Sequence, residues 1–243
     1  MASGFYCRPF LQFTLGVLQL LLMPSPIAKS IRAFIFDLDG TLIDSKTDLV
    51  NSVNAMLHEI GRKELPSETI AGYIGHGAPQ LIASVLGPNS NENDRKAALT
   101  IFLAHYEKHN LDATRPYPGV EEALAHLKTH PMAVLTNKPL KMTMQILEGL
   151  GLSEYFSAIY GGDSFEKKKP HPLGALSILN ELSTQPEHAA MVGDSDVDIQ
   201  TARNARMLAV AVTYGFGNYD RHANPADLYV DRLTELVTFP SVQ

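Results

Sequence analysis

The first pattern in the chain is a short apolar run that stops at two acids. Residues 31–36 read IRAFIF, a β-branched and aromatic stretch that is typical of a buried strand, and Asp37 and Asp39 follow it. Two carboxylates this close at a strand end repel each other, so a positively charged partner is expected between them.

From Thr47 to about Lys108 the apolar period becomes helical. The stretch DLVNSVNAMLHEIG carries an apolar stripe at Leu49, Val53, Met56, Leu57 and Ile60. Gly61 follows as the expected C-cap, and Ser67 is the expected N-cap of the next helix. A longer helix is predicted over residues 93–109, and the proline-rich stretch RPYPGV at 115–120 predicts a hinge.

Beyond this hinge, strands and helices alternate. The strands are predicted at 131–136, 156–162, 188–194 and 208–215, and the helices at 138–151, 170–182 and 195–207. This alternation indicates a parallel sheet with right-handed crossovers. The predicted fold class is α/β, a parallel sheet core with an all-helical insertion after the first strand. The expected domains are an N-terminal extension (1–29), an α/β core (30–46 and 116–243) and a helical cap (47–115).

Polar residues follow each predicted strand, and in an open parallel sheet the site lies beyond these strand ends. They are Asp37 and Asp39; Thr136 and Asn137; Gly161, Gly162 and Asp163, with Lys169 shortly after; and Gly193 and Asp194, with Asp198. Carboxylates at this density need a hard cation, and oxygen ligands from Asp37 and Asp194 suit Mg²⁺. These strand ends offer neither imidazole nor thiolate, which argues against zinc.

The same residues predict how an anionic substrate would be held and attacked. Candidate donors are Lys169, the Thr136 hydroxyl, and the backbone N–H groups of Leu38 and Asn137. If the anion is a phosphate, an aspartate close to the metal can attack it as a nucleophile. The acid two residues on points to the same face of the strand. It could protonate the leaving oxygen and then activate water, if the first carboxylate raises its pKa.

Each motif alone also has a structural interpretation. DLDG could open a calcium loop, but its glycine is fourth rather than sixth, and Asp48 stands where that loop needs a glutamate. TNK is a common turn, KKKPHP is a solvated charge run before a helix, and GDSDVD is a helix start with acids that suit the helix dipole. Their order, each at a strand end, favours one joint site.

With these motifs in place, the chain resembles the haloacid-dehalogenase-superfamily phosphatases, and among them the phosphoglycolate-phosphatase-like group with a helical cap. The resemblance covers about residues 31–237, and its four motifs are DLDGTLIDS, TNK, KKKPHP and VGDSDVD. One departure is Arg206, which stands where relatives usually have glycine.

The resemblance implies a role for each matching residue. Asp37 is the nucleophile that forms an aspartyl-phosphate, and Asp39 is the general acid and base, its main-chain carbonyl also binding Mg²⁺. Thr136 and Asn137 contact the phosphate. Lys169 bridges nucleophile and phosphate, with Lys168 as the alternative in register. Asp194 binds Mg²⁺, and Asp198 acts behind it or through water.

The stretch GYIGHGAPQLI, at 72–82, resembles the glycine-rich substrate loop of this group. Gly75 and Gly77 would let backbone N–H groups approach the substrate from above. His76, between them, would either contact the far end of the substrate or be merely exposed. Hinges at 44–46 and 115–118 would let the cap open and close over the site.

Charge and composition narrow the function classes. The net charge of −6 lacks the basic surplus of a nucleic-acid-binding protein, so no nucleic-acid partner is expected. The single cysteine, Cys7, excludes an internal disulfide framework and fits a reducing compartment, so the expected location is the cytoplasm.

The first residues do not match the rest of the chain. Residues 10–23, FLQFTLGVLQLLLM, are uncharged and mostly apolar, but too short for a comfortable membrane span. They are interpreted as an export signal or anchor, as a short interfacial or buried helix, or as sequence upstream of a true start at Met23. A membrane partner is expected only if the segment is a real anchor.

The predicted function is Mg²⁺-dependent hydrolysis of a small phosphorylated metabolite through an aspartyl-phosphate, with 2-phosphoglycolate as the leading substrate. Alternatives within the fold are a pyrophosphatase, an amino-sugar 6-phosphate phosphatase and a sugar-phosphate mutase. An alternative of another class is a non-catalytic phosphate-binding module, which would be expected to have lost at least one motif residue.

Overall fold

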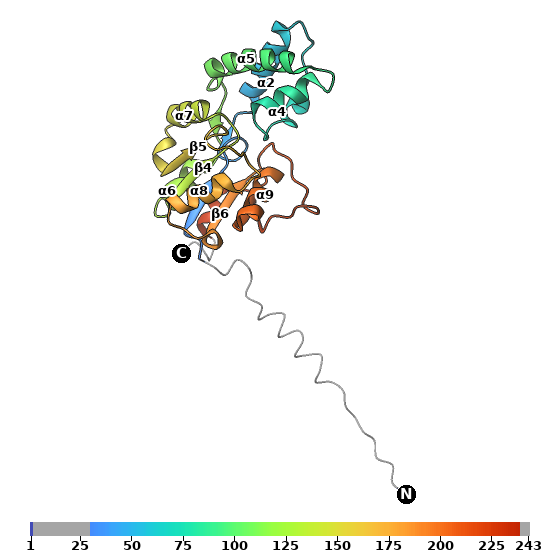
Figure 1. Ribbon diagram of the computed structural model, residues 1–243. Coiled ribbons are helices and arrows are strands. Elements are labelled where there is room, and N and C mark those ends of the chain that lie inside the picture. Colours follow the sequence, from blue (N-terminus) through green and yellow to red (C-terminus); the bar gives the residue numbers. More distant parts are fainter. Residues whose placement is uncertain (2–29, 239–243) are drawn as a thin grey trace.

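The first apolar run forms a central strand of a six-stranded sheet, in the computed structural model of residues 1 and 30–238 (Figure 1). The strand order is β5-β4-β1-β6-β7-β8, and every neighbouring pair is parallel. The strands are β1 (Ala33–Phe36), β4 (Met132–Leu135), β5 (Ala158–Tyr160), β6 (Ala189–Gly193), β7 (Leu208–Val212) and β8 (Leu228–Val230). The predicted fold class is confirmed, and β8 is an edge strand that the sequence pattern did not predict.

Alternate residues of the strands bury two separate apolar faces of the sheet, as the period of two requires. Phe34 and Phe36 of β1 pack in one core with α6 (Val120–Leu127) and α7 (Leu140–Gly149). Ala33 and Ile35 pack in a second core with α8 (Leu173–Glu181) and α9 (Asp196–Ala205). Helices on both faces explain why the strands read as continuous apolar runs. Three short 3₁₀ helices also belong to the core: η2 (Ser153–Tyr155), η3 (Pro186–His188) and η4 (Leu233–Thr238).

Four helices lie between β1 and α6 in the chain. They are α2 (Lys46–Glu59), α3 (Ser67–Ala71), α4 (Ala78–Leu86) and α5 (Glu92–His109). In Figure 1 α2, α4 and α5 form a group beyond one end of the sheet. We call these four helices the cap; the exact domain bounds stay a prediction.

The cap joins the core through two short antiparallel strands, β2 (Ile43–Asp44) and β3 (Arg115–Pro116). β3 forms the first half of the segment predicted as a hinge at 115–118, and β2 overlaps the one at 44–46 only at Asp44. Asp48, buried in the first turn of α2, braces the junction because its carboxylate accepts hydrogen bonds from three donors of the returning chain. These are Ala113 N at 2.9 Å, Thr114 N at 2.8 Å and Thr114 Oγ1 at 2.7 Å.

Two of the predicted helix boundaries have different outcomes. The C-cap of α2 is Ile60, one residue before the predicted Gly61, and Gly61 follows it in the left-handed conformation with φ 71°. The N–H of Gly61 donates to the His58 carbonyl and that of Arg62 to the Leu57 carbonyl. The predicted N-cap at Ser67 is wrong. The carbonyl of Pro66 already accepts the first bonds of α3, so Pro66 is the N-cap and Ser67 lies inside the helix.

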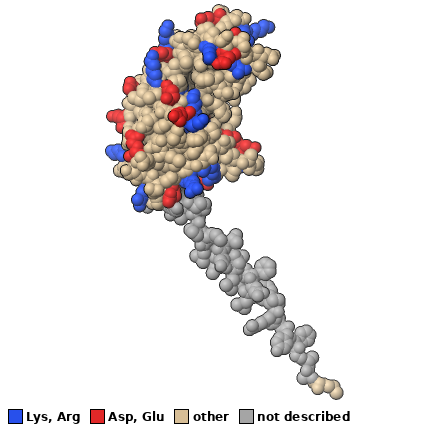
Figure 2. Space-filling model, in the orientation of Figure 1, with Lys and Arg blue, Asp and Glu red and all other residues tan. Residues whose placement is uncertain are grey.

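The expectations for the N-terminal extension fall on residues outside the described part, apart from Met1. Within the described residues, no helix combines the length and the apolar character needed to cross a membrane. On the face shown in Figure 2, Lys and Arg side chains are interspersed with Asp and Glu rather than gathered into one patch.

Candidate active site

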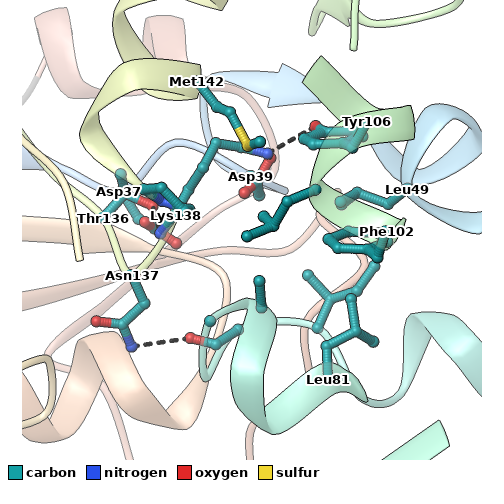
Figure 3. A pocket seen from close by; sticks show the side chains of 16 residues that line it. Asp37, Asp39, Leu49, Leu81, Phe102, Tyr106, Thr136, Asn137, Lys138 and Met142 are labelled. Carbon is teal, nitrogen blue, oxygen red and sulfur yellow. Dashed lines mark hydrogen bonds and ion pairs between the residues drawn. The ribbon is translucent and has the colours of Figure 1, made fainter. Parts of the chain in front are cut away.

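Residues that follow β1 and β4 line a cavity of about 40 Å³ where the cap faces the carboxyl end of the sheet (Figure 3). The core contributes the turn after β1 and the turn after β4, and the cap contributes the loop before α4 and one side of α5. The lining residues used below are Asp37, Asp39, Gly75, Gly77, Phe102, Tyr106, Thr136, Asn137 and Lys138.

Three buried carboxylates form the acidic part of the site. Oxygens of Asp37, Asp194 and Asp198 all lie within 4.8 Å of one another. Burial raises the pKa of Asp37 to about 6, with further upward contributions from Asp198 and Asp39 and a downward one from Lys169. Burial also raises the pKa of Asp194 well above its usual value, assisted by the charges of Asp198 and Asp37. Without a cation, the ionised form of this cluster is therefore unfavourable.

Lys169 supplies one compensating charge, as its place in KKKPHP predicts. Its ammonium lies 2.8 Å from Asp37 Oδ1 and donates to Asp198 Oδ1 at 2.6 Å. Burial lowers the pKa of Lys169, but the two aspartates outweigh burial and raise it overall, so the side chain stays charged. Lys168, the alternative in register, is exposed instead.

The glycines around Asp194 let backbone approach its carboxylate closely. A Cβ on Gly40 would lie 1.8 Å from Asp194 Oδ2, and one on Gly215 would lie 2.4 Å from Asp194 Cβ. Gly217 N donates to Asp194 Oδ2 at 2.7 Å. The motif glycine at residue 40 is therefore required by space as well as by its positive φ of 80°.

The residues fit a hard divalent cation. All three candidate ligands are carboxylates, the donor type that suits Mg²⁺. Thr41 Oγ1, in the DLDGT turn, is a buried side-chain oxygen without a hydrogen-bond partner among residues 30–238, whereas Asp37 Oδ1 in the same turn has the Lys169 ammonium at 2.8 Å as its ion-pair partner. An unpartnered buried oxygen in this turn is expected where an ion or ligand completes the site.

Asp39 has partners that the sequence did not suggest. Ser45 Oγ donates to Asp39 Oδ1, and the Lys138 ammonium lies 2.9 Å from the same oxygen. Lys138 also donates to the Tyr106 hydroxyl of α5 at 2.7 Å (Figure 3). Burial lowers the pKa of Lys138, but Asp39 and Tyr106 outweigh it and raise the pKa overall. The third residue of TNK thus links the predicted acid to the cap.

Thr136 and Asn137 end β4 at the cavity, but the Asn137 side chain is occupied by protein partners. Its amide donates to the Gly75 carbonyl at 3.0 Å and to the Lys169 carbonyl at 3.1 Å, and its oxygen accepts from Lys169 N at 3.1 Å. A substrate contact from Asn137 therefore falls to its backbone N–H. Leu38 is fully buried behind the two acids.

In the loop before α4, two glycines line the cavity but His76, between them, does not. Gly75 and Gly77 line the cavity, and a Cβ on Gly77 would lie 2.9 Å from the Asn137 carbonyl, so this position admits only glycine without displacement. His76 is exposed and lines a separate open depression with residues such as Arg95 and Lys168. The structure does not bring His76 into the cavity that holds Asp37 and Asp39.

Comparisons with known proteins agree on one family. The family model described as haloacid dehalogenase-like hydrolase matches residues 34–212. The chain is 41% identical over 197 residues to a phosphoglycolate phosphatase of Neisseria meningitidis, covering 77% of this chain and 83% of that protein. A phosphoglycolate phosphatase of Chromobacterium violaceum is 38% identical over 214 residues, covering 86% and 96%.

A crystal structure of a predicted phosphoglycolate phosphatase from Haemophilus somnus has the same fold. It superposes with a TM-score of 0.81 at 30% identity, covering 86% of this chain and 97% of that one. The match of the family model includes the turns that carry Asp37, Thr136, Lys169 and Asp194. The chain therefore belongs to the haloacid dehalogenase-like hydrolases.

Proposed function

We propose that the chain is a Mg²⁺-dependent phosphomonoester hydrolase that works through an aspartyl-phosphate, with 2-phosphoglycolate as its substrate. The observation that carries the proposal is the convergence of Asp37, Lys169, Asp194 and Asp198 beside a small cavity that Asp39 also lines. The names of the relatives, phosphoglycolate phosphatases, support 2-phosphoglycolate as the substrate. The expected compartment is the cytoplasm.

The chemistry follows from the positions of the two acids. An ionised oxygen of Asp37 attacks the phosphorus, and the bond from phosphorus to the leaving alkoxide breaks. Asp39 gives a proton to that alkoxide, then takes one from the water that hydrolyses the aspartyl-phosphate, which releases phosphate and restores Asp37. Asp39 Oδ1 is held by Ser45 and Lys138, which leaves Oδ2 to carry the proton.

Asp37, Asp194 and the Asp39 carbonyl would hold Mg²⁺, with Asp198 behind them. The ion supplies charge stabilisation for phosphoryl oxygens and keeps the carboxylates ionised. Lys169, between Asp37 and Asp198, is placed to neutralise a second part of the phosphoryl charge. The Thr136 hydroxyl and backbone N–H groups would orient the group for in-line attack.

A purified-enzyme screen tests the proposal directly. Phosphate release with Mg²⁺ is measured from 2-phosphoglycolate, inorganic pyrophosphate and glucosamine 6-phosphate, and sugar-phosphate isomerisation is measured separately. We expect the highest kcat/KM for 2-phosphoglycolate, loss of turnover in EDTA, and recovery when Mg²⁺ is added. A higher kcat/KM for another compound would mean that this compound, and not 2-phosphoglycolate, is the substrate. Activity that persists in EDTA would refute the proposed dependence on Mg²⁺. Inactivity on every compound would favour a non-catalytic phosphate-binding module.

A further inference from the structure

The cap side of the cavity is apolar. Its wall there consists of Leu49, Ile74, Ala78, Leu81, Phe102 and Leu103. Figure 3 shows Leu81 and Phe102 beside the space in front of the catalytic turn. These apolar side chains offer no hydrogen-bond partner to the hydroxyls of a highly hydroxylated leaving group.

Two polar side chains, Lys138 and Tyr106, lie next to this apolar wall. Lys138 is the only basic residue that lines this cavity among the described residues. Its ammonium has three N–H donors. One donates to the Tyr106 hydroxyl at 2.7 Å and a second faces Asp39 Oδ1 at 2.9 Å, so the third is available to a ligand.

Tyr106 adds a second donor at the same point. Its hydroxyl accepts from Lys138, and no acceptor for its own hydrogen is found among residues 30–238. The ring stacks on Phe102 with centroids 5.6 Å apart, and the Lys138 ammonium lies 4.5 Å from the Tyr106 centroid. These two contacts hold the ring in place, so two donors stand together beside the apolar part of the cavity wall.

We propose that Lys138 and Tyr106 are the specificity-determining pair that binds the carboxylate of an acidic leaving group. This inference rests on the proposed function and adds the residues that recognise the substrate. A carboxylate on a short leaving group accepts one hydrogen bond from the Lys138 ammonium and one from the Tyr106 hydroxyl. A neutral, apolar leaving group leaves the third N–H of Lys138 and the hydroxyl hydrogen of Tyr106 without an acceptor, which disfavours it.

Two phosphomonoesters of equal length separate recognition from catalysis. The acidic one is 2-phosphoglycolate, and the neutral one is propyl phosphate, whose leaving group ends in a methyl group and offers no acceptor in place of the carboxylate. The measured quantity is the ratio of their kcat/KM values in the wild type, Lys138→Met, Tyr106→Phe and Lys141→Met. Lys141 is the matched control because it also joins the core to α5, through Glu107, but is exposed and lies outside the cavity.

We expect the wild type to prefer the acidic ester and Lys138→Met to lower this preference about 10- to 100-fold, the effect of one hydrogen bond to a charged group. Tyr106→Phe should lower it about 3- to 10-fold, as for a neutral donor. Lys141→Met should leave the ratio unchanged. Tyr106→Phe removes one hydroxyl only, so it decides the question if Lys138→Met does not fold.

An equal loss for both esters in Lys138→Met would mean that the lysine acts through Asp39 alone, and would overturn the inference. A wild type without preference between the esters would also overturn it, while leaving the phosphatase activity in place. Inactivity on both esters, and on every other phosphomonoester, would instead be a failure of the proposed function.

Discussion

Asp37, the proposed nucleophile, is also a carboxylate whose ionised form is unfavourable in the metal-free fold. Its pKa is raised to about 6, so its ionised form destabilises the protein near neutral pH. We predict that Asp37→Asn lowers kcat by about 10³-fold or more, as expected for loss of a nucleophile. Without Mg²⁺, the same variant should unfold at a temperature no lower than that of the wild type.

Phosphate release and thermal unfolding in EDTA measure the two effects, and Asp163→Asn is an exposed control near the third strand end. Residual turnover within tenfold of the wild type would show that Asp37 is not the nucleophile. A clear drop in melting temperature would mean that the pair with Lys169 stabilises more than burial costs.

At the residue scale, the sequence predicted side chains that follow strands but missed those that depend on the cap. Asp37, Asp194 and Lys169 were placed together because parallel strands end at one edge of the sheet. The partners of Asp39 were missed, since Tyr106 lies on a cap helix and no local pattern places that helix over Lys138. Lys138 had one signal, its place directly after Thr136 and Asn137.

At the scale of elements, the junction of cap and core depends on Asp48. Replacing this buried carboxylate by alanine leaves the N–H groups of Ala113 and Thr114 and the Thr114 hydroxyl without their acceptor. We predict that Asp48→Ala lowers the free energy of unfolding by about 1–3 kcal/mol. Asp112→Ala, at an exposed aspartate next to the junction, should change it by less than about 0.5 kcal/mol. Equal effects in urea unfolding would contradict this role.

The end of α9 carries a residue in a strained backbone conformation. Arg206 has φ 60° and closes the helix, with Met207 N bonded to the Ala202 carbonyl. A left-handed conformation costs a residue with a side chain about 1–2 kcal/mol. Glycine avoids this cost, but part of the gain in stability is lost because the unfolded chain has more conformational freedom at glycine. We predict that Arg206→Gly raises the free energy of unfolding by about 0.5–1 kcal/mol. Arg206→Ala keeps the strain and should not; equal stabilisation by both would point to the charge instead.

Elements were predictable where a local signal fixes them. The glycine after α2 was found because its hydrogen bonds are local, and the sheet because each core strand is a continuous apolar run. The start of α3 was missed because a proline carbonyl can take the place of a serine side chain. β8 has only three residues and is half-buried at the edge of the sheet, so its apolar run is too short to predict a strand.

For the whole molecule, the stability of the fold should depend on the protonation of the acidic cluster and on the binding of Mg²⁺ to it. The folded-state pKa values of Asp37 and Asp194 lie above the unfolded value of 3.8, so the fold binds more protons than the unfolded chain. The metal-free protein should therefore gain stability as pH falls from about 7 through about 6 toward about 4, the interval between the folded and unfolded pKa values of Asp37, by at most ~1.4 kcal/mol per pH unit for each group. Thermal unfolding in EDTA across this range measures the trend.

Mg²⁺ should reverse that trend, because it binds the deprotonated carboxylates that protons neutralise at lower pH. We predict a large rise in melting temperature on adding Mg²⁺ near pH 8 and a small one near pH 5, below the raised pKa of Asp37. Asp194→Asn removes one proposed ligand and should flatten the response at both pH values. A shift of equal size at both pH values, or one that persists in Asp194→Asn, would show that Mg²⁺ binds elsewhere and that these carboxylates are not its site.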